Sequence, residues 1–168
     1  RKELHPILLS RLLALQLLSD TKFNATKLLT KYHKIHLKTK HSMDYFYELY
    51  TTSILIKNIE VMKFLINKLD VNIEYLYQKH HLNSFYLMST FYYKLTNNKA
   101  EELKNFNRFS LNECRYSYEE FIKILVLIYL YGNSKTDSEK KQLLQHYITL
   151  SKKLNYPYFS EDFILNYF

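Results

Sequence analysis

The chain has 168 residues, a size that suits one domain and buries about 68–70% of the extended-chain surface. It has one glycine, Gly132, and two prolines, whereas phosphate-binding loops and tight sheet turns require glycine. This scarcity argues against Rossmann and P-loop enzymes and favours helices joined by short polar turns. The formal net charge is +8, and the first 44 residues hold nine Lys and Arg against three acidic residues.

Other composition features bear on compartment and chemistry. The lone cysteine, Cys114, cannot form an internal disulfide, which fits a reducing compartment. No apolar run reaches the roughly 18 residues that a membrane-spanning helix needs. No nucleophile–base pair, metal-ligand cluster or phosphate loop is found. We therefore expect a cytoplasmic, non-catalytic protein that does not enter a membrane and has no cofactor or metal.

Helical periodicity runs along the whole sequence, and capping patterns mark several helix starts. Leu8, Leu12 and Leu15 share one apolar stripe near the N-terminus. Asn98 and Thr136 are each followed three positions later by Glu, as in a capping box. The predicted helices span 6–18, 25–36, 43–56, 59–69, 72–79, 83–95, 99–112, 118–131, 137–154 and 161–168.

Two predicted hairpins, over 82–112 and 117–154, resemble each other at a spacing of 36 residues. Phe85 aligns with Phe121, and the turn residue Thr96 aligns with Gly132. A helix-turn-helix unit that recurs at about 34 residues is typical of a helical solenoid. The predicted fold class is all-α, with antiparallel helical hairpins stacked as a TPR-like right-handed solenoid. An irregular helical bundle is the alternative.

The predicted organisation is a single helical-repeat domain over residues 1–168. Residues 1–41 form a basic N-terminal helical pair in this interpretation. Residues 42–168 form the repeat hairpins with a C-terminal capping helix, because no linker rich in Pro, Gly or Ser divides the chain.

Several segments carry a family resemblance. Residues 84–111 look like a tetratricopeptide-type hairpin. Residues 47–49 and 54–66, with 128–132 and 147–156, resemble the C-terminal regulatory domain of Rgg/GadR/MutR-type transcriptional regulators. The resemblance implies a bacterial regulatory domain that forms a homodimer, binds a short signalling peptide and contacts DNA only through an N-terminal domain absent from this chain. The start at Arg1 rather than Met fits that expectation.

The first helix of each hairpin is expected to line a peptide-binding groove, on the face beside an inward-packing aromatic residue. Hydroxyl, amide and aromatic side chains suit an extended peptide, which needs backbone partners and apolar pockets. For each position the alternative is an ordinary solvent-facing or core residue. The predicted groove residues are Tyr45, Glu48, Thr52, Asn83, Tyr86, Thr90, Tyr93, Glu119, Ile122, Val126 and Tyr129.

The last predicted helix is rich in aromatic residues for its length. Phe163, Tyr167 and Phe168 are expected either to cap the last hairpin or to contact a second copy in a homodimer.

A lysine stripe occupies the basic segment 22–40. Lys27, Lys31, Lys34 and Lys38 share one face of the predicted helix and give a possible nucleic-acid contact. The alternative is a solvated face. Three functions therefore stay open: a peptide-sensing regulatory domain, a generic protein–protein interaction repeat such as an effector or adaptor, and direct nucleic-acid binding.

Overall fold

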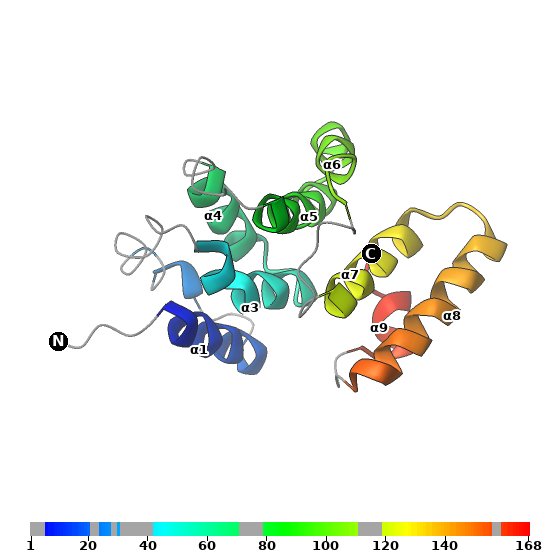
Figure 1. Ribbon diagram of the computed structural model, residues 1–168, viewed down its shortest axis with the longest axis horizontal. Coiled ribbons are helices and arrows are strands. Elements are labelled where there is room, and N and C mark those ends of the chain that lie inside the picture. Colours follow the sequence, from blue (N-terminus) through cyan, green and yellow to red (C-terminus); the bar gives the residue numbers. More distant parts are fainter. Residues whose placement is uncertain are drawn as a thin grey trace. The chain divides into compact units, whose positions relative to one another are not determined.

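The computed structural model describes residues 6–20, 24–27, 30, 42–70, 79–110, 119–155 and 159–168 (Figure 1). Every regular element in these ranges is an α-helix, which confirms the all-α prediction there, and none of these helices has the length and apolar character needed to cross a membrane. The helices are α1 (Pro6–Ser19), α3 (Ser42–Leu55), α4 (Ile59–Asp70), α5 (Lys79–Leu95), α6 (Lys99–Phe106), α7 (Glu119–Asn133), α8 (Asp137–Leu154) and α9 (Glu161–Leu165).

Most predicted helix limits agree with these bounds to within a few residues. The largest differences are at α6, which ends at Phe106 rather than near 112, and at α5, which begins four residues earlier than expected. Of the helix predicted over 25–36, only 25–27 and 30 are described, and they are helical. The helix predicted over 72–79 lies outside the described residues except for Lys79, which belongs to α5.

The chain divides into two compact units, Arg1–Ser110 and Leu111–Phe168. Each unit has its own set of packed helices. The single domain over 1–168 and the solenoid stacking both stay predictions.

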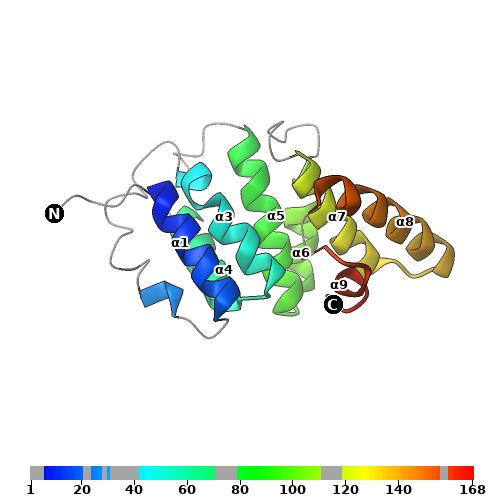
Figure 2. The same cartoon turned by 90° about the horizontal axis from the view of Figure 1, so that it is seen from below.

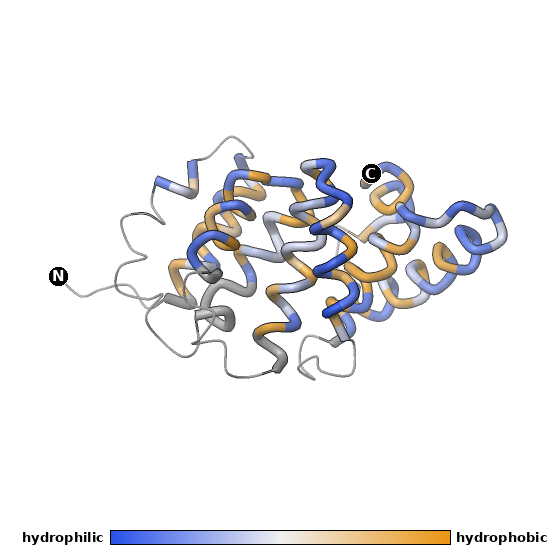
Figure 3. The backbone as a smooth tube through the Cα atoms, turned by 90° about the horizontal axis from the view of Figure 1, so that it is seen from above, coloured by the Kyte–Doolittle hydropathy of each residue, from blue (hydrophilic) through white to orange (hydrophobic). Residues whose placement is uncertain are grey.

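In the first unit, α1, α3 and α5 lie side by side and run in the same direction (Figure 2). α3 also packs on α4, and α5 packs on both α4 and α6. Apolar and polar stretches alternate along several of these helices, as expected when one face meets a core (Figure 3). α1 differs, because Leu8, Leu12 and Leu15 are exposed. Leu17, Leu49, Ile54, Met62 and Phe91 are among the fully buried side chains of that core.

The α3–α4 and α5–α6 hairpins are closed by the same turn, 40 residues apart. Lys57 and Asn97 both adopt a left-handed backbone, with φ of 55° and 58°. The amides of Asn58 and Asn98 each donate to the carbonyl five residues earlier, at 2.8 Å in both turns. This is the Schellman arrangement, which satisfies the last carbonyls of a helix and reverses the chain.

The residue after each left-handed position also begins the next helix. The side-chain oxygen of Asn58 accepts from the amide of Val61 at 3.0 Å, and that of Asn98 accepts from the amide of Glu101 at 3.3 Å. Each asparagine therefore ends one helix through its backbone and caps the next through its side chain. The predicted cap at Asn98 is confirmed.

The second unit contains the α7–α8 hairpin, whose turn is different. Gly132 was expected in that turn, and this prediction was wrong because α7 continues to Asn133 and Gly132 has no positive φ. A Cβ atom at position 132 would overlap the ring of Phe168. The glycine therefore permits a close approach of the C-terminal aromatic residue rather than a turn. The predicted cap of α8 is confirmed, since the hydroxyl of Thr136 accepts from the amide of Glu139 at 3.3 Å.

An aromatic cluster holds the C-terminal segment against the hairpin of this unit. The ring centroids of Phe163 and Tyr167 lie 5.4 Å apart, and those of Tyr167 and Phe168 lie 4.7 Å apart. Tyr147 of α8 stacks edge-on against Phe159 and donates its hydroxyl to the carbonyl of Ser160 at 3.2 Å. Burial raises the pKa of both Tyr147 and Tyr167, so these hydroxyls stay neutral. These contacts suit a cap, and contact with a second copy stays a prediction.

Asn83 of α5 closes the open end of the α5–α6 hairpin, opposite the turn. Its side chain is 2% exposed, and its amide donates to the carbonyl of Ser110. In return, the amide of Ser110 donates to the side-chain oxygen of Asn83 at 2.6 Å. This two-way contact ties the chain after α6 back onto α5.

A substitution at Lys57 tests whether the hairpin turn holds this residue in a left-handed backbone conformation. Lys57→Gly should raise the free energy of unfolding by about 1 kcal/mol, because glycine removes the steric penalty of positive φ. The control Lys63→Gly, at an exposed position inside α4, should lower it by about 1 kcal/mol. Urea unfolding of both variants measures the two values. A loss of stability in Lys57→Gly equal to that of Lys63→Gly would contradict the turn geometry.

Removing the Asn83 side chain tests the hairpin closure. Asn83→Ala should lower the free energy of unfolding by about 1–3 kcal/mol, since the amide and carbonyl of Ser110 both lose their partner. Asn107→Ala, at an exposed position of the same hairpin, should change it by less than about 0.5 kcal/mol. Chemical denaturation followed by circular dichroism compares them. Equal stability of the two variants would show that the closure contributes nothing.

Candidate functional site

A polar cavity of about 210 Å³ lies on the first unit, where α5 faces α6 and α4 adds one side. Two stripes of side chains face each other across it. The α5 stripe has the spacing i, i+3, i+7, and the α6 stripe has the spacing i, i+3, i+4, so each occupies one helix face. The principal lining residues are Tyr86, Ser89 and Tyr93 from α5, Glu101, Lys104 and Asn105 from α6, Arg108 just after it, and Asn67 from α4.

A buried carboxylate helps to hold α6 against α5 beside this cavity. Glu102 is 3% exposed, and its Oε1 lies 2.8 Å from the Nζ of Lys99 and 4.0 Å from the Nζ of Lys94. Burial lowers the pKa of Lys94, and the charge of Glu102 opposes that shift. The ion pair crosses from α5 to α6, so it helps to fix the spacing of the two stripes.

The charges that line the cavity favour an anion. The Nζ of Lys104 lies 2.9 and 3.0 Å from the two carboxylate oxygens of Glu101, so those charges offset each other. The guanidinium of Arg108 lies 5.8 Å from the centre of the Tyr86 ring, a cation–π contact. In the part of the chain that the structure describes, Arg108 pairs with no carboxylate. Its planar set of donors suits a carboxylate or phosphate ligand.

Ser89 supplies the clearest sign of an unfilled contact in this cavity. It is 1% exposed, and its hydroxyl has no hydrogen-bond partner among the described residues. A buried polar group without a partner destabilises a fold by about 1–3 kcal/mol.

Two of the predicted groove residues on α5 line this cavity, and the other two do not. Tyr86 and Tyr93 line it and are partly exposed. Asn83 is engaged with Ser110, as described above. Thr90 is fully buried, and its hydroxyl donates to the carbonyl of Tyr86 at 2.8 Å.

The predicted groove residues on α3 lie elsewhere. Glu48 accepts from the Nε of Arg11 at 2.7 Å, which links α3 to α1. Thr52 is 5% exposed and belongs to the interior of the first unit. Tyr45 belongs to α3, and its side chain is not described.

The predicted groove residues on α7 belong to the second unit. Ile122, Val126 and Tyr129 are 2%, 6% and 2% exposed, and the side chain of Glu119 is not described. Val126 lines an apolar groove of that unit rather than the polar cavity. A continuous surface across all three hairpins stays a prediction.

The basic stripe is only partly described. Lys27 is exposed, and its backbone amide donates to the side chain of Asn24 at 3.0 Å. Lys31, Lys34 and Lys38 lie outside the described residues. Within the described ranges, no three His, Cys, Asp or Glu side chains gather in a way that could hold a metal ion.

The sequence interpretation missed the α6 side of the cavity. Glu101, Lys104, Asn105 and Arg108 have helical spacing, but a charged stripe on a second helix is normally solvated. The signal that distinguishes them is the position of Arg108, which reaches the ring of Tyr86 only when the hairpin is closed.

Comparisons with known proteins leave the family open. No protein-family model, no curated protein and no solved structure matches this chain. The resemblance to Rgg/GadR/MutR-type regulators therefore stays a prediction from the sequence.

Proposed function

We propose that the chain is a non-catalytic regulatory domain that binds a short peptide through an anionic group in the α5–α6 cavity. The observation that carries this proposal is the buried Ser89 hydroxyl without a partner, in the same cavity as the Arg108 guanidinium. In the proposed complex a carboxylate binds the guanidinium of Arg108, and a small movement of the side chains over Ser89 lets it accept from the buried hydroxyl as well. The anion is the C-terminal carboxylate of the peptide or an acidic side chain.

The size and composition of the cavity support a peptide rather than a compact metabolite. About 210 Å³ accommodates one residue of a ligand, which leaves the rest of the molecule outside. Enclosed small-molecule sites are typically larger, about 300–1,000 Å³, and mostly apolar. The exposed amide of Asn67 suits the backbone of a peptide.

The regulatory part of the proposal rests on the family resemblance. Bound peptide would favour one packing of α5 and α6, because its anionic group bridges residues of both helices. That change would pass to a second copy in a homodimer and to a DNA-binding domain outside this chain. A generic interaction domain is the alternative, and it differs by requiring a folded protein partner.

Peptide selection followed by calorimetry tests the proposal. Random heptapeptides with free C-termini are selected on the 168-residue chain, and the selected peptide is titrated into variants. Arg108→Gln should weaken binding by about tenfold to a hundredfold, because it removes a charge-assisted hydrogen bond. The control Lys140→Gln should leave binding unchanged, since Lys140 also lies over a tyrosine ring, at 5.9 Å from that of Tyr131, but in the second unit.

Two results would contradict the proposal. One is that no peptide is selected while a folded protein partner binds, which would favour the generic interaction domain. The other is equal affinity of Arg108→Gln and wild type for the selected peptide. An amidated copy of that peptide identifies the anion, since only recognition of a terminal carboxylate is lost on amidation.

Ser89→Ala separates binding from stability. The substitution removes a buried hydroxyl that lacks a partner, so the free energy of unfolding should stay unchanged or rise by about 1 kcal/mol. Affinity for the selected peptide should fall several-fold. Thermal unfolding and calorimetry give the two readouts. A variant that loses stability but keeps full affinity would show that Ser89 has a purely structural role.

A further inference from the structure

Two contacts join one face of α5 to the residues that follow the C-cap of α6. The guanidinium of Arg108 lies 5.8 Å from the centre of the Tyr86 ring. The side chain of Asn83 pairs in both directions with the backbone of Ser110. Asn83 and Tyr86 are three positions apart on α5, so they project from the same side of that helix. These four residues therefore form one clamp, in which a single helix face holds both the cation of the cavity and the end of the hairpin.

The clamp fixes the chain just after α6, where the helix itself gives little support. α6 has eight residues, and an isolated helix of that length is marginal in water. The amides of Arg108 and Phe109 donate to the carbonyl of Asn105 at 3.1 and 3.2 Å, so they are held to the last turn of this short helix. The amide of Ser110 donates instead to Asn83 at 2.6 Å. Asn83 therefore fixes the backbone beside Arg108 relative to α5 rather than to α6.

The two halves of the clamp differ in burial. Asn83 is 2% exposed, so its hydrogen bonds with Ser110 form where water competes little. Arg108 is exposed, and an exposed cation–π contact is weak. A long exposed side chain has many rotamers, and a fixed backbone restricts which of them reach the Tyr86 ring. The buried pair therefore sets the position of the exposed guanidinium.

The clamp also ends at a boundary in the chain, since Ser110 is the last residue of the first unit. A ligand that holds Arg108 acts two residues before the point where the chain passes to the second unit. A ligand that binds better when the clamp is closed also favours the closed clamp, because the coupling of two equilibria is reciprocal. Occupancy of the cavity is thus linked to the state of the chain at the end of the first unit.

We propose that Asn83 is the positioning residue of the α5–α6 cavity and that it couples peptide binding at Arg108 to the end of the first unit. The positioning is a property of the free chain, whereas the coupling rests on the proposed function. With Asn83 bonded to Ser110, the guanidinium of Arg108 stays over the Tyr86 ring, where it lines the cavity. A bound anion in turn keeps Ser110 bonded to Asn83.

Nuclear magnetic resonance of the free 168-residue chain tests the positioning. The Tyr86 ring shifts protons above its face upfield, and Tyr86→Leu gives the Nε–H signal of Arg108 without that ring. In Asn83→Ala this signal should move most of the way to its position in Tyr86→Leu. The control Ser10→Ala should leave it unchanged, because Ser10 is a buried residue that accepts from the amide of Leu49 at 3.2 Å and does not line the cavity.

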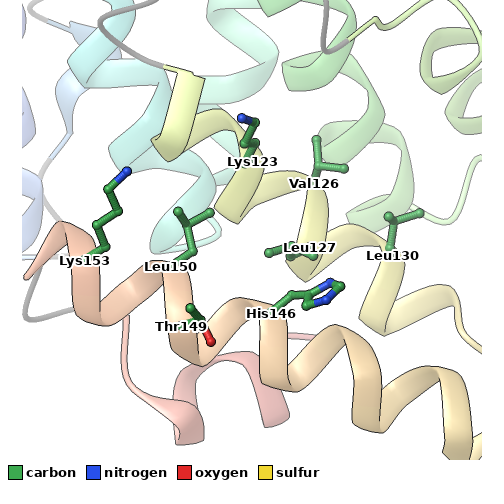
Figure 4. Close-up of a pocket in the computed structure, with 8 residues that line it drawn as sticks. All are labelled: Lys123, Val126, Leu127, Leu130, His146, Thr149, Leu150 and Lys153. Carbon is green, nitrogen blue, oxygen red and sulfur yellow. The ribbon is translucent and has the colours of Figure 1, made fainter.

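Calorimetry with the selected peptide tests the coupling. Asn83→Ala should weaken binding at least about fivefold, whereas Ser10→Ala should leave the affinity unchanged. The alternative binding place for such a peptide is the apolar groove of about 460 Å³ between α7 and α8 of the second unit (Figure 4). Thr149 is an exposed lining residue of that groove, so Thr149→Glu should also leave the affinity unchanged.

Hydrogen exchange in the wild-type chain needs no substitution, so it decides the coupling if Asn83→Ala does not fold. Saturation with the peptide should slow exchange of the Ser110 amide at least about fivefold. The comparison is the amide of Asn58, which closes the α3–α4 turn of the same unit with a bond of 2.8 Å to the carbonyl of Ser53. Its exchange should slow much less.

Two results would overturn the proposal while the proposed function stands. One is an Arg108 signal that is the same in Asn83→Ala and in wild type. The other is full peptide affinity in Asn83→Ala together with equal slowing at Ser110 and Asn58, which would make Asn83 purely structural. Loss of binding in Thr149→Glu, or failure to select any peptide, would instead refute the proposed function and the coupling with it. The Arg108 signal of the free chain then still decides the positioning.

Discussion

The first unit depends on a turn in which one residue with a left-handed backbone lies between two helices. At Lys57 and again at Asn97, positive φ lets the following amide bond back to the preceding helix. The next side chain at once caps the following helix. No residue lies between the one that ends the first helix and the one that caps the second. The two helices of each pair therefore run antiparallel and in contact. The α5–α6 cavity exists because this turn brings Tyr86 and Arg108 together from 22 positions apart.

Local patterns in the sequence were sufficient for much of the fold. The caps at Asn98 and Thr136 and most helix limits follow from residue types within a few positions of each other. Gly132 shows where local reasoning fails. A lone glycine near a helix end normally indicates a turn, but here it makes room for the ring of Phe168, a contact between residues 36 positions apart. No pattern around position 132 contains that information.

The candidate site was only half predictable for the same reason. Helical spacing identified the α5 face that holds Tyr86 and Tyr93, and the choice of hydroxyl and aromatic residues pointed to a peptide. The spacing did not reveal that Asn83 would be used to hold Ser110, or that Thr90 would be buried. It also could not separate Arg108 from an ordinary solvated residue, because the difference is a tertiary contact with Tyr86. Burial without a partner, as at Ser89, is visible only in the folded chain.

The central claim is that the α5–α6 cavity binds an anionic peptide group through Ser89 and Arg108. Nuclear magnetic resonance of the ¹⁵N-labelled 168-residue chain, titrated with the selected peptide, tests it most directly. The account predicts that the amide of Ser89 and the Nε–H signal of Arg108 shift together and saturate with the same affinity, while the amides of Leu127 and Leu150 in the second unit stay unchanged. Shifts centred on α7 and α8, with Arg108 and Ser89 unaffected, would contradict it.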